Sequence, residues 1–249
     1  LAASISYIDR RNRYDPATER GKTEIIFLDW TGAEGLVISG GYWGSTYDDS
    51  RQLTVSGKGT LVLGEHTMKG GFEYRDNEAS FYINNNQVNA LGESVYDCFT
   101  WRGNGIVRNR IPSLFVQDSW RAGSRLRVNF GLRWSGEFWV GSDGKVAQRI
   151  TDEYQPRVGV IFEPARNGTN KIFGSYGRFY QEISTLLMTL YYLEGSVYQL
   201  TEYDHDPRVD PSGGVIVSQI GGRIQKEVEG LHGQNYDEFV LGYEQALGQ

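Results

Sequence analysis

The sequence predicts an all-β fold in which antiparallel strands form part of a transmembrane β-barrel. Three observations favour it: runs of about ten residues with alternating apolar and polar side chains, short turns that alternate with long polar connections, and aromatic residues near the strand ends. A barrel strand presents alternate side chains to lipid and to a wet lumen, so mean hydropathy stays low while one face is apolar. The mean hydropathy here is −0.47.

The clearest alternation covers residues 125–138. We expect one face of this strand to meet lipid and the other to meet the lumen. The apolar set is Leu126, Val128, Phe130, Leu132 and Trp134, and the polar set includes Arg127, Asn129 and Arg133.

Further runs predict the other strands. Clear alternation recurs at 53–63, 66–76 and 236–247, and weaker alternation at 2–9, 23–30, 36–47, 112–121, 154–163 and 171–181. Together they predict about ten spanning strands.

The connections between these runs fall into two classes. Tight turns are expected at 31–35, 64–65, 121–124 and 164–170, and long polar connections at 10–22, 77–111, 139–153 and 182–235. Bacterial outer-membrane barrels have short periplasmic turns and long extracellular loops, so the two classes indicate the direction of the strands.

Composition excludes several classes of protein. A net charge of −6 without a basic stripe argues against nucleic acid as a partner. The single cysteine, Cys98, excludes an intramolecular disulfide framework and a cysteine-rich metal site, and no cofactor is indicated. The first residues lack an initiating Met and a signal peptide, so we expect a mature product or a fragment.

A soluble β-sandwich is the alternative fold. Its strands average about five or six residues, which is shorter than the runs observed. Three arginines on one strand face, Arg125, Arg127 and Arg133, are better placed beside a water-filled lumen. The membrane barrel is therefore the preferred interpretation.

Residues 113–134, SLFVQDSWRAGSRLRVNFGLRW, resemble a recurrent hairpin of TonB-dependent outer-membrane transporters. In that hairpin a strand F-x-Q-D-x-W turns tightly into a strand L-x-x-N-x-G-L-R-[YW]. Four more segments resemble successive strands of the same barrel in the family's order: KGGFEYRDN at 69–77, EYQPRVGVIFEP at 153–164, KIFGSYGRFYQ at 171–181 and YDEFVLGYEQALG at 236–248. Within the family the chain is most similar to the Oar-like receptors.

The resemblance implies a 22-stranded barrel in a Gram-negative outer membrane, of which residues 1–249 form an internal part. It also implies outer-membrane lipid, a plug domain and the TonB complex as partners, and uptake of a siderophore, cobalamin or a glycan. The chain departs from the family pattern because it shows no plug-like segment, no TonB box and no aromatic terminal residue. A non-transport barrel, either an adhesin or a porin, and a soluble β-rich binding module are the alternatives.

Two groups of candidate functional residues lie within 182–235. An acidic cluster contains the weak metal candidates Asp204, Asp206 and Asp210 beside Glu202 and His205, but it lacks the glycine placement and terminal Glu of an EF-hand. A solvated acidic loop is the simpler interpretation, and the His205–Asp pair alone does not establish a surface protease. Four tyrosines could stack on a sugar or a chelate: Tyr191, Tyr192, Tyr198 and Tyr203. Packing of these tyrosines against neighbouring parts of the protein is the simpler interpretation. We expect no catalytic residue.

Overall fold

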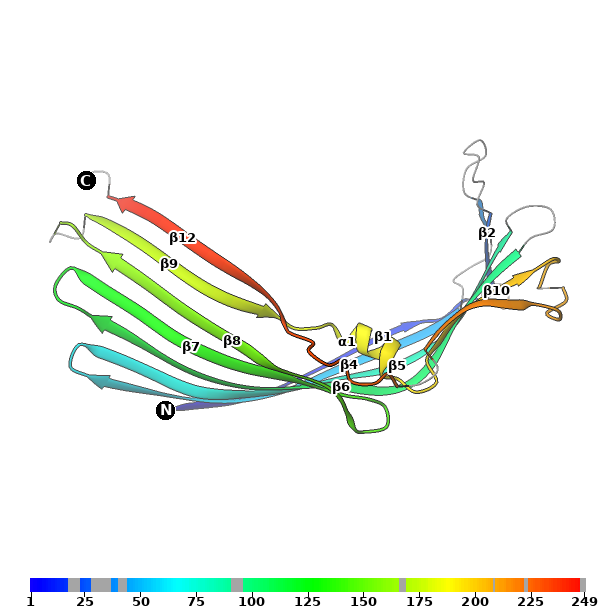
Figure 1. The fold of residues 1–249 in the computed structure, drawn as a ribbon, viewed down its shortest axis with the longest axis horizontal. Coiled ribbons are helices and arrows are strands. Elements are labelled where there is room, and N and C mark those ends of the chain that lie inside the picture. Colours follow the sequence, from blue (N-terminus) through cyan, green and yellow to red (C-terminus); the bar gives the residue numbers. More distant parts are fainter. Residues whose placement is uncertain are drawn as a thin grey trace.

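The computed structural model describes residues 1–17, 23–27, 37–39, 44–90, 96–165, 169–207, 209–221 and 224–246. In these residues twelve strands form one sheet and a single short helix lies against it (Figure 1). The bounds are β1 Ala2–Tyr14, β2 Thr23–Phe27, β3 Val37–Ser39, β4 Gly44–Leu63, β5 His66–Ala90, β6 Tyr96–Arg121, β7 Leu126–Val140, β8 Val146–Phe162, β9 Asn170–Gln181, α1 Thr185–Tyr191, β10 Val197–Tyr203, β11 Val215–Gly221 and β12 Gln234–Gln245. The all-β prediction is confirmed.

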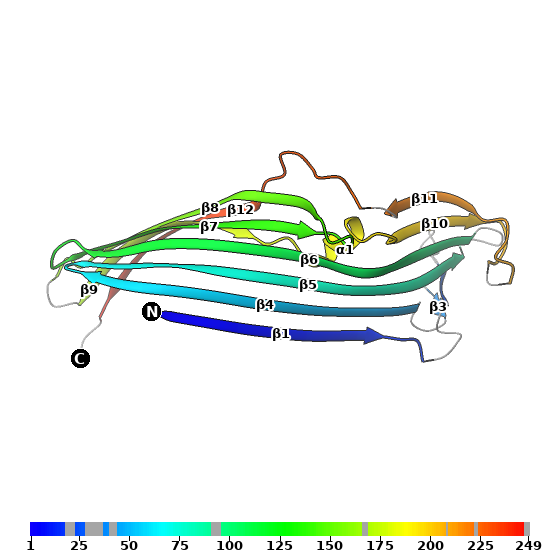
Figure 2. The ribbon, with the colours of Figure 1, turned by 90° about the horizontal axis from the view of Figure 1, so that it is seen from below.

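Eight long strands form an antiparallel path in the order β1-β4-β5-β6-β7-β8-β9-β12. Figure 1 shows them side by side in a curved wall, and Figure 2 shows the same wall from below. Two additions leave this path: β10 pairs with β6 and with β11, while the short β2 pairs in parallel with β5 and also with β3. None of the described helices is long and apolar enough to cross a membrane.

The expected tight turns join strands at one end of the wall. Gly64 and Gly123 adopt φ values of 58° and 105°, which glycine allows without steric cost, and they lie in the β4–β5 and β6–β7 turns. The backbone N–H of Arg121 donates to the carbonyl of Glu65 at 2.9 Å, so the two turns are also linked. The turns at 64–65 and 121–124 are therefore confirmed, whereas 31–35 lies outside the described residues.

Two of the expected long connections are wrong. Residues 77–111 belong largely to β5 and β6, which contain 25 and 26 residues, and 139–153 belong to β7 and β8 apart from a tight turn. At about 3.3 Å per residue, β5 is about 80 Å long, far more than a membrane crossing needs. The strands therefore continue well beyond the bilayer.

Two weak runs lie only partly within the described residues. The described residues of 23–30 form the five-residue β2, and those of 36–47 form the three-residue β3 and the start of β4. The connection expected at 10–22 begins later, because β1 continues to Tyr14.

The predicted division of β7 into an apolar and a polar face is confirmed. Arg133 donates to Glu73 of β5 across the concave face, at 2.9 Å. Phe130 and Leu132 lie on the convex face and are 50% and 44% exposed. On the convex face, exposed apolar side chains continue over the neighbouring strands, and we call the resulting surface the apolar belt: Leu53, Leu61 and Leu63 of β4, Met68 and Phe72 of β5, Leu114, Val116 and Trp120 of β6, Phe130 and Leu132 of β7, and Tyr154, Val158, Val160 and Phe162 of β8.

The height of the apolar belt matches a bilayer. On β4 it runs from Leu53 to Leu63, about 33 Å along the strand. A strand tilted by about 40° converts this into about 25 Å along the membrane normal, the height of the apolar band in outer-membrane barrels. The convex face is therefore suited to lipid.

Residues 182–233, which we call the strap, connect β9 to β12 and include α1, β10 and β11. Figure 1 shows α1 on the concave side of the wall. Three strap side chains, Met188, Tyr192 and Leu193, complete the main hydrophobic core. The core residues from the wall are Ala79, Phe81, Ile83, Val107, Trp139 and Ile150. The strap is thus packed on the barrel wall. The long connection expected over 182–235 is present between β9 and β12, but it contains a helix and two strands.

Candidate functional site on the concave face

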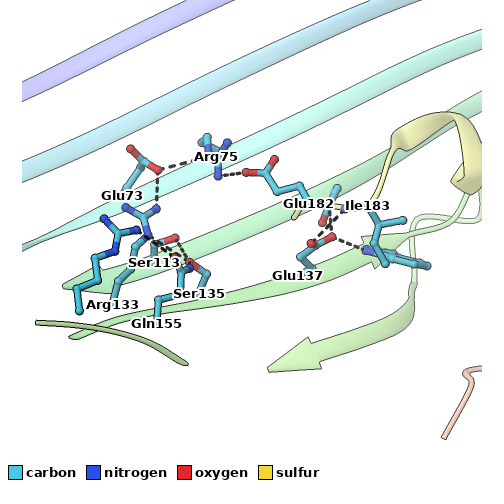
Figure 3. Close-up of polar contacts among 12 residues, drawn as sticks. Glu73, Arg75, Ser113, Arg133, Ser135, Glu137, Gln155, Glu182 and Ile183 are labelled. Carbon is cyan, nitrogen blue, oxygen red and sulfur yellow. Dashed lines mark hydrogen bonds and ion pairs between the residues drawn. The ribbon is translucent and has the colours of Figure 1, made fainter. Parts of the chain in front are cut away.

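A polar network covers the concave face at the level of the apolar belt (Figure 3). Glu73 accepts a hydrogen bond from Arg133 Nη2 at 2.9 Å, and its carboxylate lies 3.4 Å from the Nε atom of Arg75. Ser113 and Ser135 share a hydrogen bond of 2.9 Å between their hydroxyl groups. The network joins three neighbouring strands and gives the concave wall the polar surface of a lumen.

A second, buried site lies just beyond the apolar belt. The Glu137 carboxylate is fully buried and accepts hydrogen bonds from Asn109 Nδ2 at 2.7 Å and Trp139 Nε1 at 2.9 Å. It also accepts the backbone N–H of Ile183, the second residue of the strap, at 3.3 Å. These hydrogen bonds matter because a buried carboxylate oxygen without a donor would destabilise the fold. Glu137 therefore ties the start of the strap to β6 and β7.

Glu153 is the neighbouring buried carboxyl group on β8. Glu153 is 3% exposed and Glu137 is fully buried, on two neighbouring strands. Two neighbouring buried carboxyl groups cannot both be ionised cheaply. The pair forms an acidic centre beneath the strap.

The strap is fastened at its far end as well. Gln148 of β8 exchanges two hydrogen bonds with the backbone of Val228, accepting at 2.7 Å and donating at 3.1 Å. Arg149 pairs with Glu227 at 3.0 Å, and His232 pairs with Asp152. Arg75 also pairs with Glu182 where the strap begins. Both ends of the strap are therefore fixed to the wall.

A groove of about 530 Å³ opens on the wall below the strap. Its wall includes Gly131, Gly159 and Gly177, whose missing side chains leave room, and polar groups such as Gln117 and Gln155. Arg157 lies in the groove with its guanidinium 4.6 Å from the centre of the Phe179 ring. The described residues provide Arg157 with one side-chain acceptor, Gln155 Oε1 at 3.4 Å. The groove thus offers a cation and several amides to a polar occupant.

The four predicted tyrosines do not form one surface. Tyr192 is 4% exposed and packs edge-on against Trp139 with ring centres 5.6 Å apart, so it is a core residue. Tyr191 is partly exposed at the end of α1, and Tyr203 lies near His205 at the end of β10. Tyr198 packs near two aromatic rings of β6. Ligand contact by these tyrosines stays a prediction.

The acidic cluster lies at the β10–β11 connection. Asp204 pairs with His205 at 2.5 Å, and this hydrogen bond raises the pKa of His205 and lowers that of Asp204. The Asp210 carboxylate accepts the backbone N–H of Ser212 at 2.9 Å, which lowers the pKa of Asp210. Throughout the described ranges, no group of three or more His, Cys, Asp or Glu side chains is placed to hold a metal ion. Asp204 and Asp210 therefore stabilise the turn.

Sequence reasoning missed three sites. Phe99 and Trp101 flank Tyr198 on the concave face, with ring centres 6.1 and 6.5 Å from it, and their spacing of two along β6 was the available signal. The Glu137 site had no such signal, because its donors come from distant parts of the chain. The third site is His66, which begins β5 and hydrogen-bonds to the buried Asp118 at 2.5 Å.

Comparisons with known proteins agree with this architecture. A family model described as TonB dependent receptor-like, beta-barrel matches residues 2–215. The TonB-dependent transporter Oar of Myxococcus xanthus is 32% identical over 74 residues, which represent 30% of this chain and 7% of that protein. No solved structure matches.

Proposed function

Because this chain belongs to the TonB-dependent receptor-like β-barrel family, we propose that it forms part of the wall of a receptor that takes up a scarce nutrient with energy supplied through TonB. The family places the chain in the cell outer membrane and is a family of receptors and transporters rather than of enzymes. In the whole protein, a plug domain, the TonB complex and a small-molecule or glycan ligand are the proposed partners.

The main support is the opposite character of the two faces of the same strands. On β7 the convex face carries Phe130 and Leu132, whereas Arg133 on the concave face is hydrogen-bonded to Glu73. Such strands separate lipid from a polar interior, as an uptake channel requires. The concave groove around Arg157 provides a polar surface for a plug or a passing solute.

The strap favours a receptor over an open porin. It covers part of the concave face and is fastened through Glu137 at one end and Gln148 at the other. Binding residues often lie on connecting segments that a rigid scaffold holds in place, and the strap is such a segment. We propose that accessible strap residues, including the exposed Tyr191 and the half-buried Tyr198, contact the ligand.

The test measures uptake in cells that produce the full-length protein. Accumulation of a ferric siderophore, cobalamin and an oligosaccharide is compared between wild-type cells, cells lacking the gene and cells lacking TonB. We expect accumulation of one probe to fall by a similar factor in both mutants. Uptake that persists without TonB, together with stable ion conductance of the purified protein in planar bilayers, would establish the porin alternative.

A further inference from the structure

A band of charged side chains crosses the convex face above the apolar belt, and we call it the charged belt. The strand register places its members on the same face as Val55, Tyr74 and Leu114. It contains five arginines and four carboxylates: Arg11, Arg13, Arg51, Arg108 and Arg110 with Asp9, Asp49, Asp76 and Glu78. Lysine is absent from this set, although lysines occur elsewhere in the chain.

The charged belt begins at the height of a lipid headgroup. Tyr74 and Pro112 pair across β5 and β6, and the next convex-facing pair is Asp76 and Arg110. One such step is about 7 Å along the strand, and each headgroup layer is about 5 to 8 Å thick. The short turns lie at the opposite end of the strands, which places the charged belt at the outer leaflet.

The internal ion pairs of the charged belt leave arginine donors unused. Glu78 accepts Arg51 at 2.9 Å and also binds Arg108. Asp76 lies 3.8 Å from Arg108 and 3.9 Å from Arg110, which are ion-pair distances too long for hydrogen bonds. The Arg110 side chain is 41% exposed, although its Nε atom is buried, and this Nε atom has no hydrogen-bond partner among the described residues.

This chemistry fits phosphate. Arginine presents a planar fork of donors that binds two phosphate oxygens at once, whereas lysine acts as a point charge. Basic clusters beside a hydrophobic membrane surface bind anionic headgroups. The carboxylates hold the guanidinium groups in place and keep the net charge of the charged belt close to zero. The charged belt therefore recognises phosphate by geometry as well as by charge.

We propose that the charged belt binds the phosphorylated headgroup of an outer-leaflet lipid, with Arg108 and Arg110 as phosphate ligands. The lipid chains then lie on the apolar belt directly below, which makes the two belts one continuous lipid-binding surface. This inference goes beyond the proposed function, because it rests on the location in the outer membrane and not on the nutrient that is transported.

The experiment uses the purified full-length protein and native mass spectrometry. Bisphosphorylated lipid A, its dephosphorylated form and phosphatidylcholine are added at equal concentration, and bound lipid is measured for each. We expect wild-type protein to prefer bisphosphorylated lipid A by about tenfold or more. Arg108→Gln combined with Arg110→Gln removes this preference. Lys58→Gln combined with Lys69→Gln, on the concave face of β4 and β5, removes the same charge and retains the preference.

A variant that is expected to bind lipid more tightly distinguishes loss of the site from misfolding of the protein. Asp76→Asn keeps both arginines and releases them from their nearest shared carboxylate, so phosphorylated lipid should bind more tightly than to wild type. Equal binding of the phosphorylated and dephosphorylated lipids by wild-type protein would overturn the proposal. An equal loss of the preference for phosphorylated lipid in the Lys58→Gln, Lys69→Gln control would also overturn the proposal. Complete displacement of lipid A by millimolar inorganic phosphate would indicate a site for free anions instead of lipid.

Discussion

Met188 offers a direct test of how the strap is held. Its side chain is 0% exposed and lies in the core formed with β5, β6, β7 and β8. Replacing a fully buried methionine by alanine costs about 2 to 5 kcal/mol, because apolar contacts are lost and a cavity remains. These contacts join the strap to the wall, so Met188→Ala should destabilise the closed strap and leave the spanning strands paired.

Hydrogen exchange measures this local opening. The backbone N–H of Ser142, in the β7–β8 turn, donates to the carbonyl of Tyr192 in the strap at 3.0 Å and reports whether the strap is closed. A loss of about 2 kcal/mol raises the open population about thirtyfold. We therefore expect exchange at Ser142 to accelerate by at least that factor in Met188→Ala, measured on full-length protein in detergent.

The matched control is Leu187→Ala, one position earlier in α1, where the side chain is 48% exposed. This substitution removes a similar side-chain volume from the same helix. It should leave hydrogen exchange at Ser142 nearly unchanged. Equal acceleration in both variants would mean that helix propensity, and not core packing, holds the strap. Unchanged exchange in Met188→Ala would refute the packing argument itself.

Two further predictions concern the wall and the acidic cluster. Phe130→Arg, on the lipid face, should cost about 2 to 4 kcal/mol in denaturant unfolding from lipid vesicles, whereas Asn129→Arg on the concave face should be mild; equal costs would place β7 one residue out of register. The pKa of His205 should lie above its ordinary value by NMR titration and fall in Asp204→Asn; a value unchanged by that substitution would exclude the ion pair as its cause.

The spanning part of the strands was predictable, and their extension was not. Within the bilayer the apolar side chains of β5 occupy even positions such as Phe72 and Tyr74, which face lipid. Beyond Asp76 and Glu78 the apolar positions become odd, at Ala79, Phe81 and Ile83, because there the concave face packs on the strap and the convex face meets water. A sequence pattern that assumes one continuous apolar face therefore ends the predicted strand at the point where the apolar side chains change from the convex to the concave face.

The candidate site was predicted less well for a related reason. Stacking by Tyr198 was expected on composition alone, but its partner Trp101 lies almost a hundred residues earlier and meets it only through the β6–β10 pairing. The Glu137 site likewise depends on Ile183 of the strap. Alternation specifies which face a residue takes along one strand, and it carries no information about the segment that later covers that face.

The pairing of β10 with β6 determines which strand edge the protein exposes. β7 pairs with β6 only from Arg108 onward, and β10 pairs with β6 from Tyr96 to Arg102. The backbone groups of that part of β6 are therefore hydrogen-bonded within the chain and are not available to pair with another chain. In the described part of the chain β11 then becomes an edge strand, as β1, β3 and β12 are, with Val215, Ile216 and Val217 exposed. An exposed apolar edge favours self-association of the protein outside the membrane, and a lysine at Val217 would oppose it.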